Sequence, residues 1–121
     1  MIKLTFCLTR RPELTREMFQ SYWIDHHAPL VASVRDVLRI RRYIQLHSAP
    51  AEVSKTIRES RGGPEGYDGV AQLWWDSFDD LAASAADPAA IAAGRLLLED
   101  EKTFIDLARS PLWWGEEKVV F

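Results

Sequence analysis

The stretch Gly-Val-Ala-Gln-Leu-Trp-Trp, residues 69–75, ends on two adjacent tryptophans, and a second adjacent pair stands at Trp113 and Trp114. We predict that each pair lies in a strand. Because neighbouring side chains of a strand point to opposite faces of its sheet, each pair puts one indole on either face. A sheet that is apolar on both faces needs cover on both. We therefore expect helices of this chain to cover one face and a second subunit to cover the other.

The remaining strands are predicted from the alternation of apolar and polar residues. Together the strands cover residues 2–8, 38–47, 69–75 and 112–121. Gly115 in the last of them is expected to mark a bulge or a close approach of two backbones. Residues 48–67 are rich in glycine and proline, and are predicted to form a long loop with at most one helical turn near residues 55–60.

Helices are predicted between these strands. Thr15 is placed as the N-cap of the first one, whose apolar residues recur at spacings of three and four. Pro29 should kink this helix near residues 25–28, or end and restart it. Ser77 caps a short helix over residues 78–86, and Pro88 begins another that runs to about Ala108. The order β-α-β-β-α-β predicts one α+β domain, residues 1–121, with a ferredoxin-like, antiparallel four-stranded sheet.

The composition excludes several classes of partner. The chain has 121 residues, of which 47% are hydrophobic and 27% charged, and its formal net charge is −3. This balance offers no basic surface for a nucleic acid or an anionic membrane, and no stretch is long and apolar enough to cross a bilayer. Cys7 is the single cysteine, so no intrachain disulfide can form and a cytoplasmic location is expected. The first residues do not follow the pattern of a signal peptide.

The stretch from Leu14 to Val31 resembles the start of EthD-domain proteins. The resemblance rests on Leu14-Thr15-Arg16-Glu17, Phe19, Tyr22-Trp23 and His27-Ala28-Pro29-Leu30-Val31, and continues at Tyr43, His47, Asp68-Gly69-Val70-Ala71 and Trp74. It implies a dimeric α/β barrel, in which two ferredoxin-like sheets pack face to face with the helices outside. The tryptophan pairs lead to the same expectation from strand geometry.

The resemblance leaves two classes of function open. We expect a small, cofactor-independent enzyme that acts on an apolar or aromatic carbonyl or carboxylate compound by decarboxylation, dehydration or isomerisation. The alternative is a non-catalytic accessory protein that binds a hydrophobic metabolite for an oxidative degradation system. A fold alone does not choose between them.

His27 is the first candidate catalytic residue. Its imidazole would act as a general acid or base near neutral pH. The structural alternative is that it hydrogen-bonds the backbone freed by Pro29. On an unbroken helix His26 lies nearer the apolar stripe, whereas the EthD resemblance favours His27. We follow the resemblance, because the proline makes the ideal helical angle unreliable there.

His47 is the second candidate catalytic residue, and it shares a strand face with Tyr43, roughly 13 Å away along the strand. The alternative for this pair is a polar strand face at a dimer seam. The candidate substrate-binding residues are Tyr22, Trp23, Tyr43, Asp68, Trp74 and Trp113. The alternatives are core packing for the aromatic residues and a simple turn for Asp68. No metal site is expected, since His26 and His27 are adjacent rather than four apart and no paired-cysteine motif occurs.

Overall fold

The four strands of the chain form one antiparallel sheet. A computed structural model describes residues 1–121, with strands β1 (Ile2–Leu8), β2 (Arg42–His47), β3 (Gly69–Trp75) and β4 (Leu112–Glu116). Their order across the sheet is β2-β3-β1-β4. β1 is central and pairs with β3 and β4, so that Leu4 lies opposite both Leu73 and Trp114. The predicted α+β fold with a four-stranded antiparallel sheet is confirmed.

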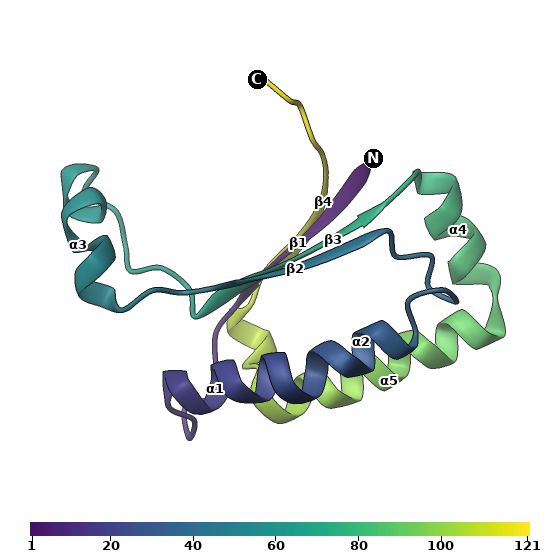
Figure 1. Ribbon diagram of the computed structural model, residues 1–121, viewed down its shortest axis with the longest axis horizontal. Helices are drawn as coiled ribbons and strands as arrows, with labels where there is room; N and C mark the ends of the chain where they lie inside the picture. Colours follow the sequence, from purple (N-terminus) through teal and green to yellow (C-terminus); the bar gives the residue numbers. More distant parts are fainter.

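The helices lie on one face of this sheet (Figure 1). They are α1 (Arg16–Tyr22), a π-helical turn (Trp23–His27), α2 (Ala28–Ser33), α4 (Phe78–Ala86), α5 (Pro88–Phe104) and a short 3-10 turn (Leu107–Arg109). α1, α2 and α5 pack beneath the strands, and the core lies between the two layers. Phe19, Trp23 and Phe104 are among its fully buried side chains, as is Leu8 from β1.

Both tryptophan pairs divide between the two faces of the sheet. Trp75 and Trp114 meet edge to face on the helical side, with ring centroids 5.2 Å apart. Trp74 points to the opposite face, where Lys3 and Arg42 place their cations 5.1 and 4.9 Å from its ring. Trp113 shares that face by alternation and is 52% exposed. No helix covers this second face (Figure 1), which we call the open face.

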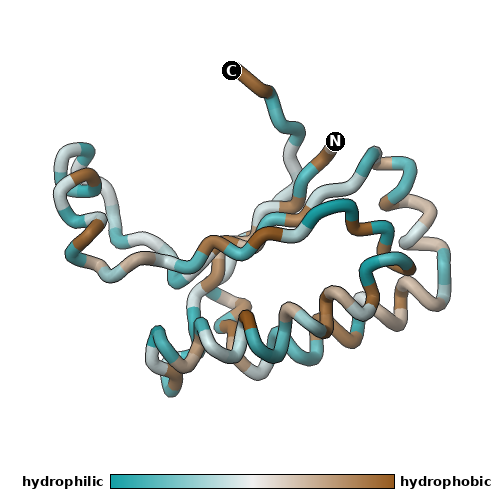
Figure 2. The backbone as a smooth tube through the Cα atoms, in the orientation of Figure 1, coloured by the Kyte–Doolittle hydropathy of each residue, from teal (hydrophilic) through white to brown (hydrophobic).

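The segment between β2 and β3 differs from the predicted loop. Residues Ala51–Ser60 form the helix α3, which begins after Pro50 and has no buried residue. It projects away from the rest of the molecule (Figure 1). Val53 and Ile57 are exposed on it, and hydrophobic stretches are visible both there and at the end of the C-terminal tail (Figure 2). The predicted loop is wrong here: the prediction rests on the prolines and glycines at residues 50, 62, 63, 64 and 66, all of which lie outside Ala51–Ser60.

Three element boundaries also differ from the prediction. β2 begins only at Arg42, because Arg39 adopts a left-handed conformation and turns the buried Ile40 into the core. α5 ends at Phe104 and β4 at Glu116, in each case several residues early. Gly115 is neither a bulge nor a close approach: it pairs in regular register with Lys3, and no atom lies within 4 Å of where its Cβ would stand.

No single helix in the structure is long and apolar enough to cross a membrane. α4 and α5 reach the required length and hydropathy only when taken together, and they meet at an angle of 95°.

The close approach of backbones that strand glycines often mark occurs at Gly69. A Cβ there would stand 2.4 Å from Cζ3 of Trp23 and 2.9 Å from the Leu46 carbonyl oxygen. We expect Gly69→Ala to destabilise the protein by about 1–3 kcal/mol, because Trp23 is fully enclosed and has no room to move. Urea denaturation measures the change.

Gly94→Ala is the matched control. Gly94 lies within α5, and nothing stands within 4 Å of its Cβ position. Alanine is the better helix former, so this change should stabilise the protein by roughly 0.5–1 kcal/mol. Equal effects of the two substitutions would contradict the packing of Trp23 on Gly69.

Candidate active site

The site begins at the break that Pro29 imposes on the first helix. Proline has no N–H, and its ring excludes the carbonyl four residues earlier, which belongs to Asp25. The helix responds by widening: the Ala28 N–H donates to the Trp23 carbonyl, five residues back. The predicted interruption is therefore a π-helical turn, a feature that is often found at functional sites.

The π turn decides which histidine points inward. Phe19, Trp23, His27 and Val31 are all buried, at a spacing of four residues. In an α-helix each step of four residues overshoots a full turn by about 40°, so such a series would drift off the core face. The extra residue in the π turn takes up this drift. His27 is 5% exposed, whereas the His26 side chain is 60% exposed. The structure thus places His27, and not His26, toward the core.

A carboxylate on the neighbouring helix α5 holds the His27 ring in place. Its Nδ1 lies 2.6 Å from Oδ2 of Asp100 in α5. The Tyr22 hydroxyl donates to Oδ1 of the same carboxylate at 2.5 Å, and the Thr103 hydroxyl donates to Tyr22 at 3.2 Å. The His27 ring also packs on Phe104, with centroids 5.0 Å apart. This is the arrangement in which a carboxylate orients an imidazole and selects its tautomer.

The pKa values of this pair define its protonation. Burial lowers the pKa of His27 below its ordinary value, and this effect outweighs the opposing influence of the Asp100 hydrogen bond. Burial acts to raise the pKa of Asp100, but the hydrogen bonds from Tyr22 and His27 outweigh it and hold that pKa low. At neutral pH, therefore, an ionised Asp100 accepts a hydrogen bond from the Nδ1–H of a neutral His27. Nε2 keeps its lone pair and has no hydrogen-bond partner in the chain.

An apolar cavity of about 160 Å³ lies between the sheet and the helices, and His27 lines it. Phe6, Trp23, Tyr43 and Trp75 contribute aromatic walls, and aliphatic side chains from the sheet, the helices and the segment before β2 supply most of the rest. An apolar cavity of about 150 Å³ is large enough to take up a benzene ring. The cavity therefore suits a flat apolar group of about that size.

Glu101 is the only carboxylate that lines the cavity. Its side chain has no hydrogen-bond or ion-pair partner. Burial, with a smaller contribution from the neighbouring charge of Asp100, raises the pKa of Glu101 to about 7. A neutral imidazole and a carboxyl that titrates near neutrality thus line the same small apolar space. Such a pair supplies a base and an acid for proton transfer.

Asp100 and Glu101 are not among the site residues predicted from the sequence. A signal was present, since Glu101 stands four residues after Leu97 and three before Phe104, both of which are buried. An acidic residue in the apolar stripe of a helix is unusual, because removing a carboxylate from water costs free energy. Residues of this kind are therefore candidates for a functional site.

Two of the remaining candidates line the cavity as well, namely Trp23 and Tyr43. His47 does not line it, and lies outside: its ring stacks on the far side of Trp23, with centroids 4.6 Å apart. Gln45 joins these residues, because its amide donates to the Trp23 carbonyl and to the Tyr43 hydroxyl and its oxygen lies 2.8 Å from Nε2 of His47. The structure thus connects His47 to the site through Trp23 and Gln45 only.

The other candidates lie apart from the cavity. Asp68 forms an ion pair with Arg10 at 2.5 Å and also accepts from its backbone N–H, which ties the start of β3 to the end of β1. Trp74 and Trp113 belong to the open face. Tyr22 stands behind the site and reaches it only through Asp100. No three potential metal ligands gather anywhere in the structure.

The sheet order and the helical layer define a ferredoxin-like α+β protein. A sequence model of the EthD domain matches residues 11–108. The chain therefore belongs to the EthD family, as its residues from Leu14 to Val31 indicate. No curated protein sequence matches the chain.

Several solved structures resemble the chain. An ethyl tert-butyl ether D family protein from Bacillus halodurans is 19% identical, with a TM-score of 0.61 over 98% of this chain and 100% of that one. A dimeric protein of unknown function and ferredoxin-like fold from Bacteroides fragilis is 14% identical, with a TM-score of 0.58 over 96% and 95%. SnoaB, a cofactor-independent oxygenase from Streptomyces nogalater, is 13% identical, with a TM-score of 0.53 over 98% and 94%. At these identities the likeness establishes the fold alone.

Proposed function

We propose that this chain is a small enzyme that acts on an apolar or aromatic carbonyl compound by proton transfer, without a cofactor. The observation that carries this proposal is the pairing of His27 with Glu101 in one ring-sized apolar cavity. Family membership and the fold shared with a cofactor-independent oxygenase support a role in processing a small metabolite. The buried single cysteine, Cys7, supports a cytoplasmic location.

Dehydration of a β-hydroxy carbonyl compound illustrates the proposed chemistry. Nε2 of His27 removes the proton next to the carbonyl, and the protonated carboxyl of Glu101 gives a proton to the departing hydroxyl, which leaves as water. The imidazolium then returns its proton to Glu101 through that water. Isomerisation uses the same two groups, with the proton returned to a different carbon. Asp100 acts as a positioning residue, since it contacts His27 and not the cavity.

The test is product analysis with a panel of ring-sized β-hydroxy carbonyl compounds, unsaturated ketones and aromatic carboxylates. We expect turnover of at least one class, with exchange of solvent deuterium at the carbon beside the carbonyl. Tight binding without turnover or exchange across the panel would instead favour the accessory role, in which the cavity stores a hydrophobic metabolite.

We further propose that the protein is a homodimer joined through the open face. Leu46 and Trp113 are 56% and 52% exposed there, beside the buried Trp74. A second copy of the same face is the cover that an apolar sheet surface needs, and the related Bacteroides fragilis protein is dimeric.

Sedimentation equilibrium is expected to give twice the chain mass of 13.8 kDa. Trp113→Glu should weaken the dimer, because it would bury a charge within the seam. Met18→Glu, at an exposed position on α1, is the control and should leave the mass unchanged. A wild-type monomer at micromolar concentration would contradict the proposed dimer.

A further inference from the structure

A groove with a basic lining adjoins the cavity where α2 faces β2. Its volume is about 320 Å³, and Val31, Ile40 and Tyr43 line both the groove and the cavity. All the charged residues that line the groove are arginines: Arg35, Arg41 and Arg42. A ligand with its apolar part in the cavity would therefore place its other end among these arginines.

Two of the three arginines already have partners. Arg41 forms an ion pair with Asp76 at 2.6 Å. Arg42 lies over the ring of Trp74, on the open face. Neither Arg35 nor Arg42 forms an ion pair with a carboxylate, but Arg42 is engaged with Trp74, so Arg35 is the groove arginine that has neither a carboxylate nor an aromatic partner.

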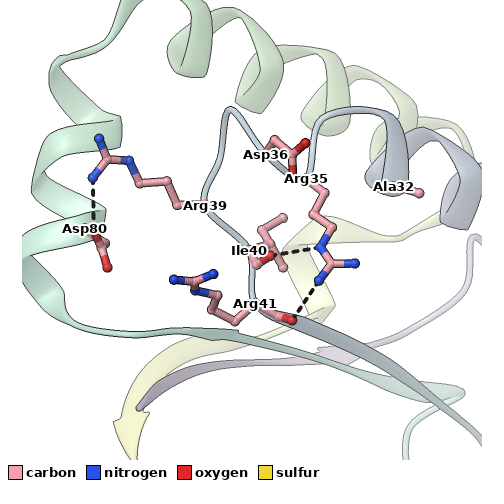
Figure 3. A pocket seen from close by; sticks show the side chains of 7 residues that line it. All are labelled: Ala32, Arg35, Asp36, Arg39, Ile40, Arg41 and Asp80. Carbon is pink, nitrogen blue, oxygen red and sulfur yellow. Dashed lines mark hydrogen bonds and ion pairs between the residues drawn. The ribbon is translucent and has the colours of Figure 1, made fainter.

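The guanidinium of Arg35 is nevertheless held in place. Its Nε and Nη2 donate to the carbonyls of Ile40 and Arg41, each at 3.3 Å (Figure 3). These bonds leave Nη1 without a partner. A guanidinium that is already oriented loses less conformational freedom when it binds an anion, and its planar donors match a carboxylate.

The groove widens outward into a shallow depression of about 580 Å³, which also contains acidic residues (Figure 3). One of them, Asp80, is paired with Arg39 at 3.0 Å. The other, Asp36, lies outside the groove itself, and no ion pair joins it to Arg35. The charge next to the cavity is therefore positive, whereas that of the outer depression is mixed.

We propose that the substrate is an organic acid whose ring-sized apolar part fills the cavity and whose carboxylate binds Arg35 in the groove. This inference rests on the proposed function for the identity of the site. Arg35 then acts as a specificity residue. It selects acids over the corresponding amides and fixes which carbon of the substrate lies beside His27 and Glu101.

The test compares the binding of phenylacetate and phenylacetamide, which differ in charge and little in size, with toluene as a probe of the cavity. Isothermal titration of the wild-type chain should show phenylacetate binding about tenfold more tightly than phenylacetamide, the ratio expected of one charge-assisted hydrogen bond. Arg35→Gln should remove this preference and leave toluene binding unchanged. Arg35→Lys should keep part of it, because the charge remains without the planar fork. Arg39→Gln is the matched control and should behave as the wild type.

Several results would overturn the inference. These are an equal affinity of the wild type for both probes, a preference that survives Arg35→Gln, and toluene that neither binds nor competes with phenylacetate. Should Arg35→Gln fail to fold, salt provides a second measurement in the wild type. Raising NaCl from about 0.01 M to about 1 M shortens the Debye length from about 30 Å to about 3 Å, and must shrink the preference.

Binding and turnover are measured separately, in the Arg35 and His27 variants, so that this inference and the proposed function can fail independently. A preference that depends on Arg35 in a protein with no turnover on any panel compound would uphold acid binding and refute the enzyme. Turnover that depends on His27 but not on Arg35 would refute acid binding and uphold the enzyme.

Discussion

His27→Gln is expected to lower kcat by about 10²–10⁴-fold, the contribution of a positioned proton-transfer group. Glutamine has a similar size and can still donate a hydrogen bond to Asp100, but it has no lone-pair nitrogen to accept a proton. The π turn is formed by backbone groups, so the fold and the dimer should persist. Steady-state kinetics on the substrate found in the panel gives the rate, and circular dichroism with sedimentation checks the structure.

His26→Gln is the neighbouring control. The His26 side chain is 60% exposed and approaches Asp100 only at 3.5 Å, beyond hydrogen-bonding distance. Its replacement should change kcat by less than a few-fold. Activity of His27→Gln within a few-fold of the wild type would show that the histidine only stabilises the helix break. Loss of activity in His26→Gln alone would assign the wrong histidine to the cavity.

Glu101→Gln should stabilise the protein against unfolding at and above neutral pH, by up to about 3 kcal/mol. The pKa of Glu101 is about 7 in the folded protein, against an ordinary value of 4.5. Each unit of such a difference corresponds to about 1.4 kcal/mol. Because the folded-state pKa is the higher one, the protonated carboxyl favours folding at low pH. That contribution is lost as the pH rises from about 4.5 through about 7, where the folded protein must bury the charge.

The measurement is the difference in unfolding free energy between the wild type and Glu101→Gln, followed from pH 4.5 to pH 8 by urea denaturation. Taking the difference removes the effect of His27, whose lowered pKa acts in the opposite direction and costs stability as the pH falls. We expect the two proteins to be similar near the low end and to diverge toward neutrality. A difference that does not change with pH would contradict a partly buried, unpaired carboxyl.

The same substitution should alter the pH profile of the reaction. If Glu101 acts as the acid, kcat/KM of the wild type falls as the pH rises above about 7, and this limb is absent from the much slower Glu101→Gln enzyme. Glu99→Gln, at an exposed position on the same helix, serves as the control for both measurements. An unchanged alkaline limb in Glu101→Gln would assign the acid role to another group.

Local signals in the sequence predicted much of the fold. Thr15 and Ser77 cap their helices through their own side chains, as expected, and β1 and β3 match the predicted bounds. The N-caps and the alternation are recognisable because the interactions span only a few residues. The end of β4 was overestimated because apolar residues continue past Glu116 to Val119, Val120 and Phe121, all of which are exposed.

The sequence by itself determined the order of the four strands and of the helices that pack on them, the division of the indoles between two sheet faces and the presence of a break at Pro29. Each of these depends on the period of a strand or helix, or on the covalent chemistry of one residue. Only the tertiary structure decided that His27 rather than His26 points inward, because the choice depends on how the helix widens around the proline. It alone brought Asp100, Glu101 and Arg35 to the same region. Asp100 is 73 residues from the histidine it contacts, and a contact between two neighbouring helices leaves no periodic trace in either segment.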